Sequence, residues 1–507
     1  MVARVLLAGL VALGLGLRLW GVGFGLPETY HPDEPAYVLQ ALAVGRGLSG
    51  GLTFANPPLF KYLLLGEYGA TYGLGRLVGR YTTPQDLVAQ FRADPTLLYL
   101  EARVTSALAG ALTVLATYTL AEGRRAGLVA AWLAAVTFLL VRDAHFGVND
   151  AFVTLLSTMA LSCCARLAGG GSRRDQLLAG VLSGLAFTAK YQALALLVPL
   201  LLAHARRPRA LPLTLGAMLL AIAVTFPSLW LEPGRVLGDI YLHLVLPGQV
   251  GYAGLEPVGG YVYYLDVLGW GVGWAIVVAA LTSLALVRRA PGLLVIASFP
   301  AVLYAVLGAE RLYFARLILP GLPALLALAA IAVDRAAAGL RTRRTLVVVG
   351  LAALLGSQSV LAAVRLDVLL SRPDTRTEAR DWVALNLPSG ARLAVDAAPL
   401  GPPLPADQLE VVVANGWSLY ERAPSAYRAD GVAYIVTSSF TLDPPESDPS
   451  REAQRRAFVA DLAATADELI RFGPSTGHFT YDEIYAPAVD LWQREQPGPT
   501  IVVFRLR

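Results

Sequence analysis

Acidic and basic residues gather at the point where the first hydrophobic segment of this chain ends. The stretch TYHPDEPAYV, residues 29–38, holds His31, Asp33 and Glu34 close together. A carboxylate within hydrogen-bond reach of a hydroxyl can take its proton, and partial burial favours this by raising a carboxyl pKa. The same acids can instead cap a following helix, because helix N-termini favour negative charge.

Similar residues recur near the ends of other hydrophobic segments. RDAHFGVND, residues 142–150, contains His145 and Asp150. Positive charge near segment ends comes from Lys61, Lys190, Arg311 and Arg316. Ionisable groups at membrane depth are costly and indicate a functional site by default. Carboxylates beside cations suggest a substrate that carries a phosphate and a reaction that needs a base.

The composition indicates an α-helical polytopic membrane protein. Of the 507 residues, 56% are hydrophobic and 15% are charged, whereas soluble proteins are about 25% charged. Apolar stretches long enough to cross a bilayer of roughly 30 Å recur along the first 365 residues. The predicted spans are residues 4–22, 98–121, 126–141, 151–167, 176–188, 191–204, 211–229, 266–287, 292–308, 317–333 and 345–365. About 11 transmembrane segments are therefore expected. They should be helices, because backbone groups in lipid must be paired within their own segment.

Arginine clusters in alternate gaps between the spans predict the orientation through the positive-inside rule. The clusters assigned to the cytoplasm are Arg124 and Arg125; Arg166, Arg173 and Arg174; Arg206, Arg207 and Arg209; Arg288 and Arg289; and Arg341, Arg343 and Arg344. Residues 177–204 have basic clusters on both sides, so they are predicted to cross twice and to turn near Lys190. The N-terminus is then cytoplasmic, the first segment is an uncleaved span, and a long first outer loop covers residues 23–97.

Residues 366–507 predict a soluble α/β domain on the outer face. Strand candidates are ARLAVD, LEVVVA, GVAYIVTSS, DEIYA and TIVVFRLR, and residues 451–471 have helical periodicity. The domain shows no nucleophile elbow, phosphate loop or zinc signature, so a recognition or structural role is expected. The adjacent Cys163 and Cys164 offer neither a disulfide framework nor metal spacing.

Four motifs give the first 330 residues a resemblance to GT-C superfamily glycosyltransferases. They are HPDE after the first span, NPPLFK in the same outer loop, ARVTSALAGALTVLATY (102–118) and AHFGVNDAFVTLL (144–156). The closest likeness is to bacterial relatives of protein O-mannosyltransferases and aminoarabinose transferases, which use polyprenyl-phosphate sugars. EARDWVALNLPSGARLAVD also resembles the start of the outer domain often found in these chains.

The resemblance implies roles for the residues at these motifs. Asp33 would be the general base of an inverting transfer, with Glu34 and Asp150 as further catalytic acids. Lys61 would hold the departing lipid phosphate, since fixed positive charge stabilises it. Further candidates for phosphate or substrate binding, chosen because they are predicted to lie near the outer face, are Arg103, His145, Lys190 and Arg311. Each has a structural alternative: the acids can cap helices, and long basic side chains can reach the headgroups.

The resemblance also predicts cofactors and partners. Transferases of this kind generally need no catalytic metal, so none is expected, although His145 and the nearby acids could ligate one. The expected partners are a polyprenyl-phosphate-linked sugar and a lipid, glycan or protein acceptor, with no nucleic acid. They would meet at the outer face of a bacterial-type cytoplasmic membrane. Two alternatives stay open: a transporter or flippase of lipid-linked sugars, and a metal-dependent oligosaccharyltransferase-like enzyme.

Overall fold

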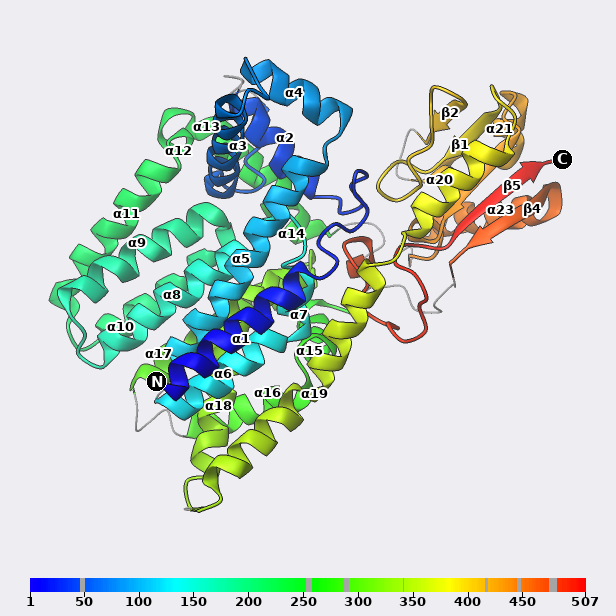
Figure 1. The fold of residues 1–507 in the computed structure, drawn as a ribbon. Coiled ribbons are helices and arrows are strands. Elements are labelled where there is room, and N and C mark those ends of the chain that lie inside the picture. Colours follow the sequence, from blue (N-terminus) through cyan, green and yellow to red (C-terminus); the bar gives the residue numbers. More distant parts are fainter. Residues whose placement is uncertain are drawn as a thin grey trace. The chain divides into compact units, whose positions relative to one another are not determined.

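The computed structural model is mostly helical and forms two compact units (Figure 1). It describes residues 1–45, 51–121, 123–251, 258–285, 291–340, 342–414, 418–444, 448–473 and 481–507. The helical unit comprises Met1–Val22, Asp33–Val250 and Gly259–Val364. The C-terminal unit comprises Arg365–Arg507 together with Gly23–Pro32 and Gly251–Val258, of which residues 252–257 lie outside the described part. The cytoplasmic assignments of Arg288, Arg289 and Arg341 also fall outside it.

The helical unit is built from helices α1 to α19, the last of which continues into the C-terminal unit. Their bounds are α1 Val2–Leu19, α2 Glu34–Gly45, α3 Leu59–Leu77, α4 Pro84–Ala93, α5 Thr96–Leu120, α6 Arg124–Val136, α7 Phe138–Arg142, α8 Asp150–Ala168, α9 Arg173–Ala189, α10 Leu197–His204, α11 Leu211–Thr225, α12 Ser228–Leu231, α13 Pro233–Ile240, α14 Leu246–Val250, α15 Gly260–Gly271, α16 Trp274–Ser283, α17 Pro291–Ala309, α18 Leu322–Ala336 and α19 Arg344–Leu370. Tyr191–Leu196 and Ala315–Gly321 are short 3₁₀ helices that lead into α10 and α18.

Helices α5, α6, α8 and α18 form the buried centre of this unit, and α9 packs between α8 and α11. A capping box begins α9, in which Asp175 Oδ2 accepts from Ser172 N at 2.9 Å. Gly180 and Gly184 lie four residues apart on the face toward α11. A Cβ on Gly180 would clash with the carbonyl of Thr214, and one on Gly184 would lie 2.6 Å from the carbonyl of Met218. Small residues at this spacing therefore let the two helices approach closely.

Seven helical segments of the described residues are long and apolar enough to span a membrane. They are Val2–Leu19, Thr96–Leu120, Asp150–Ala168, Pro208–Thr225, Pro291–Ala309, Ala315–Ala336 and Arg344–Asn386. Helices α15 and α16 make an eighth if they count as one span, bent by 108°. The chain is thus a multi-pass membrane protein, whereas the count of eleven stays a prediction. The expected span 126–141 breaks at Thr137, and α9 has 17 residues, so neither passes as one long helix.

The C-terminal unit contains a five-stranded sheet with helices α20 to α23. The bounds are α20 Thr375–Asn386, β1 Arg392–Val395, β2 Glu410–Val413, α21 Pro424–Ala429, β3 Tyr434–Ser438, α22 Ser439–Leu442, α23 Pro449–Thr465, β4 Ala466–Phe472 and β5 Ile501–Leu506. The strand order is β2-β1-β3-β5-β4, with β1 parallel to β2 and β3 and with β5 antiparallel to β3 and β4. Residues of α20 and of α23 belong to two different hydrophobic clusters, each of which includes side chains of the sheet.

Two local predictions for this unit were wrong. DEIYA does not form a strand, because Tyr481–Ile484 is a 3₁₀ helix. The carboxylate of Glu483 there accepts from the backbone of Ala488 and Val489 at 3.0 and 2.9 Å, which curls the chain around it. The helical periodicity of residues 451–471 also extends too far, since α23 ends at Thr465 and ADELIRF pairs with β5 as β4. Tertiary pairing at the sheet edge overrides the local pattern there.

Asp396 follows β1 and is almost completely buried at the end of the strand. Its carboxylate accepts hydrogen bonds from Leu419 N at 2.9 Å, Ser438 N at 3.2 Å and Thr441 Oγ1 at 2.7 Å. Burial outweighs these bonds and raises the pKa of Asp396 to about 6 from its usual 3.8. The folded unit therefore binds a proton here more tightly than the unfolded chain does.

We expect the C-terminal unit to become more stable as the pH falls from 7 to 5. The protonated form of Asp396 is favoured in the folded state below about pH 6, and the gain between pH 7 and pH 5 is on the order of 1 kcal/mol. Asp396→Asn should remove this pH dependence, measured by thermal unfolding of the detergent-solubilised protein across this range. Asp467→Asn is the matched control, because Asp467 is 43% exposed in a surface ion pair. An unchanged pH profile in Asp396→Asn would assign the effect to other groups.

Candidate functional site

Asp33 lies directly before α2 and forms an ion pair with Arg316. Its carbonyl accepts a hydrogen bond from Ala36 N at 3.0 Å, which closes the first turn of the helix. The side chain of Asp33 is 34% exposed and that of Arg316 is 12% exposed. Arg316 belongs to the 3₁₀ helix Ala315–Gly321, which continues into α18. The contact therefore joins the beginning of the chain to a helix near the centre of the unit.

Asp150 and Lys190 form a second ion pair, which is buried. Asp150 is the first residue of α8, and Lys190 follows the last residue of α9 in an extended conformation. Their side chains are 2% and 8% exposed. The helix breaks at Lys190, which is the point where the sequence predicted a turn between two short spans. The break brings the ammonium group to the N-terminal end of the neighbouring helix.

Tyr37 lies among the charges of these two ion pairs. It stands one helical turn after Asp33, its residue surface is 3% exposed, and it interacts electrostatically with Asp33, Asp150 and Arg316. Lys190 in turn interacts electrostatically with Arg316 and Asp33. We refer to these five residues as the charge cluster. Two carboxylates and two cations around a phenol can accept a proton and can also neutralise a phosphate.

Two members of the charge cluster were missed as site residues by sequence reasoning. The sequence predicts Tyr37 only as part of the helix that follows the acids, although its spacing of four residues from Asp33 places it on the same side of that helix. Arg316 was recognised as a cation of its loop, but Arg311 was chosen instead. In the structure Arg311 is exposed, and its backbone N–H donates to Gly248 O at 2.7 Å.

Glu34 and Arg103 form a completely buried ion pair next to the charge cluster in sequence. Arg103 Nε donates to Glu34 Oε1 at 2.7 Å and Arg103 Nη2 donates to Glu34 Oε2 at 2.8 Å. Glu34 Oε1 also accepts from Gly147 N at 2.7 Å, and Arg103 Nη1 donates to Val22 O at 3.0 Å. Both side chains are 0% exposed. This arrangement favours a positioning role over the catalytic and phosphate-binding roles expected from the sequence.

His145 is also buried, and both ring nitrogens face backbone carbonyls. Nδ1 lies 2.9 Å from Val141 O and Nε2 lies 3.0 Å from Trp20 O. The imidazole thus connects the end of α1 to the loop that precedes α8. This geometry favours a structural role over the expected substrate contact.

Lys61 lies in the first turn of α3 and is 2% exposed. Its Nζ donates to Thr53 O at 2.7 Å and to Asn56 O at 3.0 Å, so it holds the loop that carries NPP. Burial lowers the pKa of Lys61 to about 7, although the nearby Asp239 opposes the shift. Phe60, the preceding residue, packs edge-on against Tyr37 with ring centroids 5.6 Å apart. Lys61 is therefore a direct neighbour in sequence of a residue that touches the charge cluster.

Within the part of the chain that the structure describes, no group of three or more His, Cys, Asp or Glu residues could hold a metal ion. Asp33 and Asp150 each face a cation instead of another acid. The expectation that no metal is required stays a prediction.

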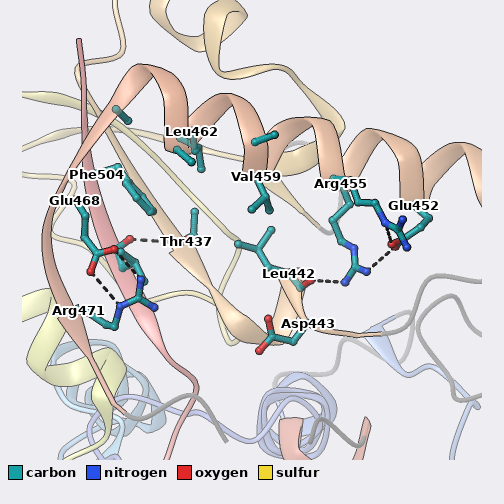
Figure 2. A pocket seen from close by; sticks show the side chains of 15 residues that line it. Thr437, Leu442, Asp443, Glu452, Arg455, Val459, Leu462, Glu468, Arg471 and Phe504 are labelled. Atoms are coloured by element: carbon teal, nitrogen blue, oxygen red, sulfur yellow. Dashed lines mark hydrogen bonds and ion pairs between the residues drawn. The ribbon is translucent and has the colours of Figure 1, made fainter. Parts of the chain in front are cut away.

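A hollow with a volume of about 1140 Å³ lies in the C-terminal unit, between α23 and strands β3 to β5 (Figure 2). Its charged side chains pair with one another, since Glu452 contacts Arg455 and Arg456, and Glu468 contacts Arg471. Arg455 also donates to the carbonyls of Leu442 and Pro444. The hollow therefore has an apolar floor, and the charged side chains at its rim neutralise one another. It lacks the combination of a base and cations for a phosphate that the charge cluster has.

Comparison with known proteins places the fold. Residues 99–231 match the family model described as dolichyl-phosphate-mannose-protein mannosyltransferase. The structure of ArnT from Cupriavidus metallidurans bound to undecaprenyl phosphate superposes with a TM-score of 0.55 and 16% identity, over 98% of this chain and 97% of that one. The apo oligosaccharyltransferase of Archaeoglobus fulgidus gives a TM-score of 0.51 and 12% identity, over 86% and 69%. No curated protein sequence gives a significant match.

The family model covers α5 to α12, which include Arg103, Asp150 and Lys190. The two structural neighbours share little sequence with this chain, so their similarity shows the fold alone. Together these matches confirm the resemblance drawn from the sequence: residues 99–231 are similar to a mannosyltransferase family, and the fold is similar to those of ArnT and an oligosaccharyltransferase.

Proposed function

We propose that this protein is a membrane glycosyltransferase that moves a sugar from a polyprenyl-phosphate donor to an acceptor hydroxyl with inversion, and that Asp33 is the general base. The observation that carries the proposal is the charge cluster. It combines a partly exposed carboxylate, Asp33, with two cations, Arg316 and Lys190, in a unit built of apolar helices.

The comparisons support the donor class. The matching family model is described by its use of a lipid-phosphate sugar, and the ArnT neighbour was crystallised with undecaprenyl phosphate. A lipid phosphate needs an apolar surface for its chain and fixed cations for its head. The helical unit supplies the apolar surface, and Arg316 and Lys190 supply the cations. We further propose that the transfer takes place at the outer membrane face, with the N-terminus in the cytoplasm of a bacterial-type cell, because the arginine clusters between the spans favour this orientation.

The reaction would use the two ion pairs in different ways. Asp33 would accept the proton of the acceptor hydroxyl as its oxygen attacks the anomeric carbon. The bond from that carbon to the phosphate oxygen breaks, and the departing phosphate takes the electron pair. Arg316 and Lys190 would stabilise the negative charge that develops there. Asp150 would hold Lys190 in place, because its buried carboxylate has little access to an acceptor.

The buried residues around the cluster would position it. Glu34 and Arg103 fix the residue next to Asp33, and His145 fixes the loop before Asp150. A flippase of lipid-linked sugars would use the same cations without needing a base beside them. The exposure of Asp33 therefore favours the transferase over transport.

Asp33→Asn should abolish transfer without abolishing lipid binding. The amide has nearly the same shape but cannot accept the proton, and loss of a general base costs about 10²–10⁴-fold in rate. Release of polyprenyl phosphate from a panel of lipid-phosphate sugars, measured with purified protein, tests this. Asp94→Asn is the matched control, because Asp94 is exposed at the end of α4. Full activity of Asp33→Asn would remove Asp33 as the base.

Treatment with EDTA should leave the activity intact. A monophosphate leaving group carries less charge than a pyrophosphate, and Arg316 and Lys190 can neutralise it. The same release assay, with and without EDTA and then with added Mg²⁺ or Mn²⁺, makes the comparison. Activity that is lost with EDTA and restored by a divalent cation would favour an oligosaccharyltransferase-like reaction instead.

Lys61→Met should weaken donor binding and flatten its pH dependence. Because the pKa of Lys61 is about 7, its positive charge is lost as the pH rises from 6 to 8, and the KM for the donor should rise at least about threefold in the unmodified protein. The Met variant should show a higher KM that no longer changes over this range. Arg76→Met, at an exposed position of the same helix, is the control. If Lys61 only holds the loop, the variant lowers the unfolding temperature and the pH profile of KM persists.

A further inference from the structure

The chain segment directly before Asp33 belongs to the C-terminal unit. Residues 23–32 follow α1 and precede α2, yet they cluster with residues 365–507 and not with the helices on either side. Tyr30 and His31 are 2% and 1% exposed. We call residues 23–32 the tether segment, because it ends one peptide bond before Asp33.

Helix α20 holds Tyr30 by two separate contacts. The phenol of Tyr30 forms a hydrogen bond of 2.6 Å with Thr377 Oγ1. The guanidinium carbon of Arg376 lies 4.0 Å from the centre of the Tyr30 ring, which is a close cation–π contact. Arg376 and Thr377 are adjacent on α20, so one turn of this helix contacts both the hydroxyl edge and the face of the Tyr30 ring.

Arg376 is itself held by further hydrogen bonds. Asp374 accepts from Arg376 Nε and Nη2, both at 2.8 Å, and Arg376 also donates to Pro399 O. The side chains of Arg376 and Asp374 are 3% and 0% exposed. Buried, bidentate pairs of this kind are rigid because both hydrogen bonds define one plane.

Two further contacts restrain the rest of the tether segment. Glu28 pairs with Arg380 at 3.0 Å, one turn further along α20. The ring of His31 lies 5.3 Å from that of Tyr485. Gly25 has φ +72°, and a Cβ there would lie 2.6 Å from the Tyr30 ring, so the turn before Tyr30 requires glycine.

The restraint reaches Asp33 through very little chain. Only Pro32 separates the buried His31 from Asp33, and two residues span at most about 7 Å. Proline also fixes its own φ near −65°, which removes one of the few rotations left. On the other side of Asp33, Glu34 is fixed by its buried pair with Arg103. Asp33 therefore lies between two residues, His31 and Glu34, that are each held by contacts within their own unit.

We propose that Tyr30 and Arg376 are positioning residues for Asp33, through which the C-terminal unit sets the placement of the carboxylate. This inference rests on the proposed function, in which Asp33 is the general base. It gives the C-terminal unit a role in the transfer step that does not require it to contain catalytic residues. We call the contacts of Arg376 and Thr377 with Tyr30 the clamp. Loss of the clamp leaves donor binding unchanged and lowers the rate of the step in which Asp33 accepts the proton, because that step needs a precisely placed base.

The test compares Arg376→Ala with the gentler Thr377→Val in the full-length protein. Arg376→Ala should lower kcat at least tenfold, and Thr377→Val should lower it two- to fivefold, while the KM for the lipid-phosphate donor stays within twofold. Arg422→Ala is the matched control, since Arg422 stacks on Tyr427 at 4.7 Å elsewhere in the same unit. It should leave kcat unchanged. A fall in thermal stability with unchanged kcat in both clamp variants would show a purely structural role and overturn the proposal.

Combination with Asp33→Asn separates a positioning role from an independent one. If Arg376 acts through Asp33, Arg376→Ala should cause no further loss of residual activity in the Asp33→Asn background. Multiplicative losses would overturn the proposal. If the wild-type protein shows no transfer, or if the Asp33→Asn variant is active, the result counts against the proposed function. The contacts of Tyr30 with Arg376 and Thr377 are then tested by a labelling experiment that does not depend on activity.

A labelling experiment tests the clamp without relying on activity. In a background with Cys163 and Cys164 replaced by alanine, Asp33→Cys reports its own exposure to a water-soluble maleimide. Addition of Arg376→Ala should raise the labelling rate at least fivefold, and addition of Arg422→Ala should not change it. Equal rates in all three proteins would show that the tether segment does not control this position.

Discussion

The buried ion pair of Glu34 and Arg103 is the interaction on which the rest of the helical unit depends. Its atoms bond to the end of α1 through Val22, to α2, to α5 and to the loop before α8 through Gly147. Both charges are fully removed from water, so loss of either partner would leave the other uncompensated, at a typical cost of 3–5 kcal/mol. A Cβ on residue 147 would lie 2.7 Å from Ala102, so only glycine lets the loop come this close.

This junction explains why two acids at adjacent positions have different surroundings. Glu34 points into the packed interior and is satisfied by three hydrogen bonds, whereas Asp33 is partly exposed beside Arg316. One carboxylate holds the backbone and the neighbouring one keeps access to solvent. The same division recurs at α8, where His145 holds the loop and Asp150 starts the helix opposite Lys190. Fixed groups thus lie next to each of the two ion pairs.

Much of this arrangement could be predicted from the sequence, and the remainder has a common physical reason. HPDE, NPPLFK and the segment around Asp150 were recognised because they combine residue types and order that are visible locally. The break at Lys190 followed from basic clusters on both sides of one apolar segment. The sequence could not distinguish Arg311 from Arg316, because both lie in one short loop. The structure leaves Arg311 exposed and places Arg316, which pairs with Asp33, at the start of the next helix.

The partners of Glu34 could not be predicted either. Arg103 lies 69 positions away, and nothing in its local pattern distinguishes a buried partner from a side chain that reaches the headgroups. The assignment of residues 23–32 to the C-terminal unit was likewise hidden, since their contacts depend on side chains more than 340 positions later. The strand β4 was read as helix because its sequence suits both, and its pairing with β5 decided the outcome.

The long separation between Tyr30 and Thr377 has a consequence for biosynthesis. The two residues are 347 positions apart, so the ribosome has synthesised the helices between them before α20 exists. Residues 23–32 therefore lack their native partners in α20 during most of translation. Long-range contacts of this kind form late, because the entropy of closing so large a loop is lost before any contact energy is gained. Residues 23–32, directly before Asp33, are consequently among the last parts of the molecule to reach their final conformation, and nascent chains that stop short of α20 lack their partners.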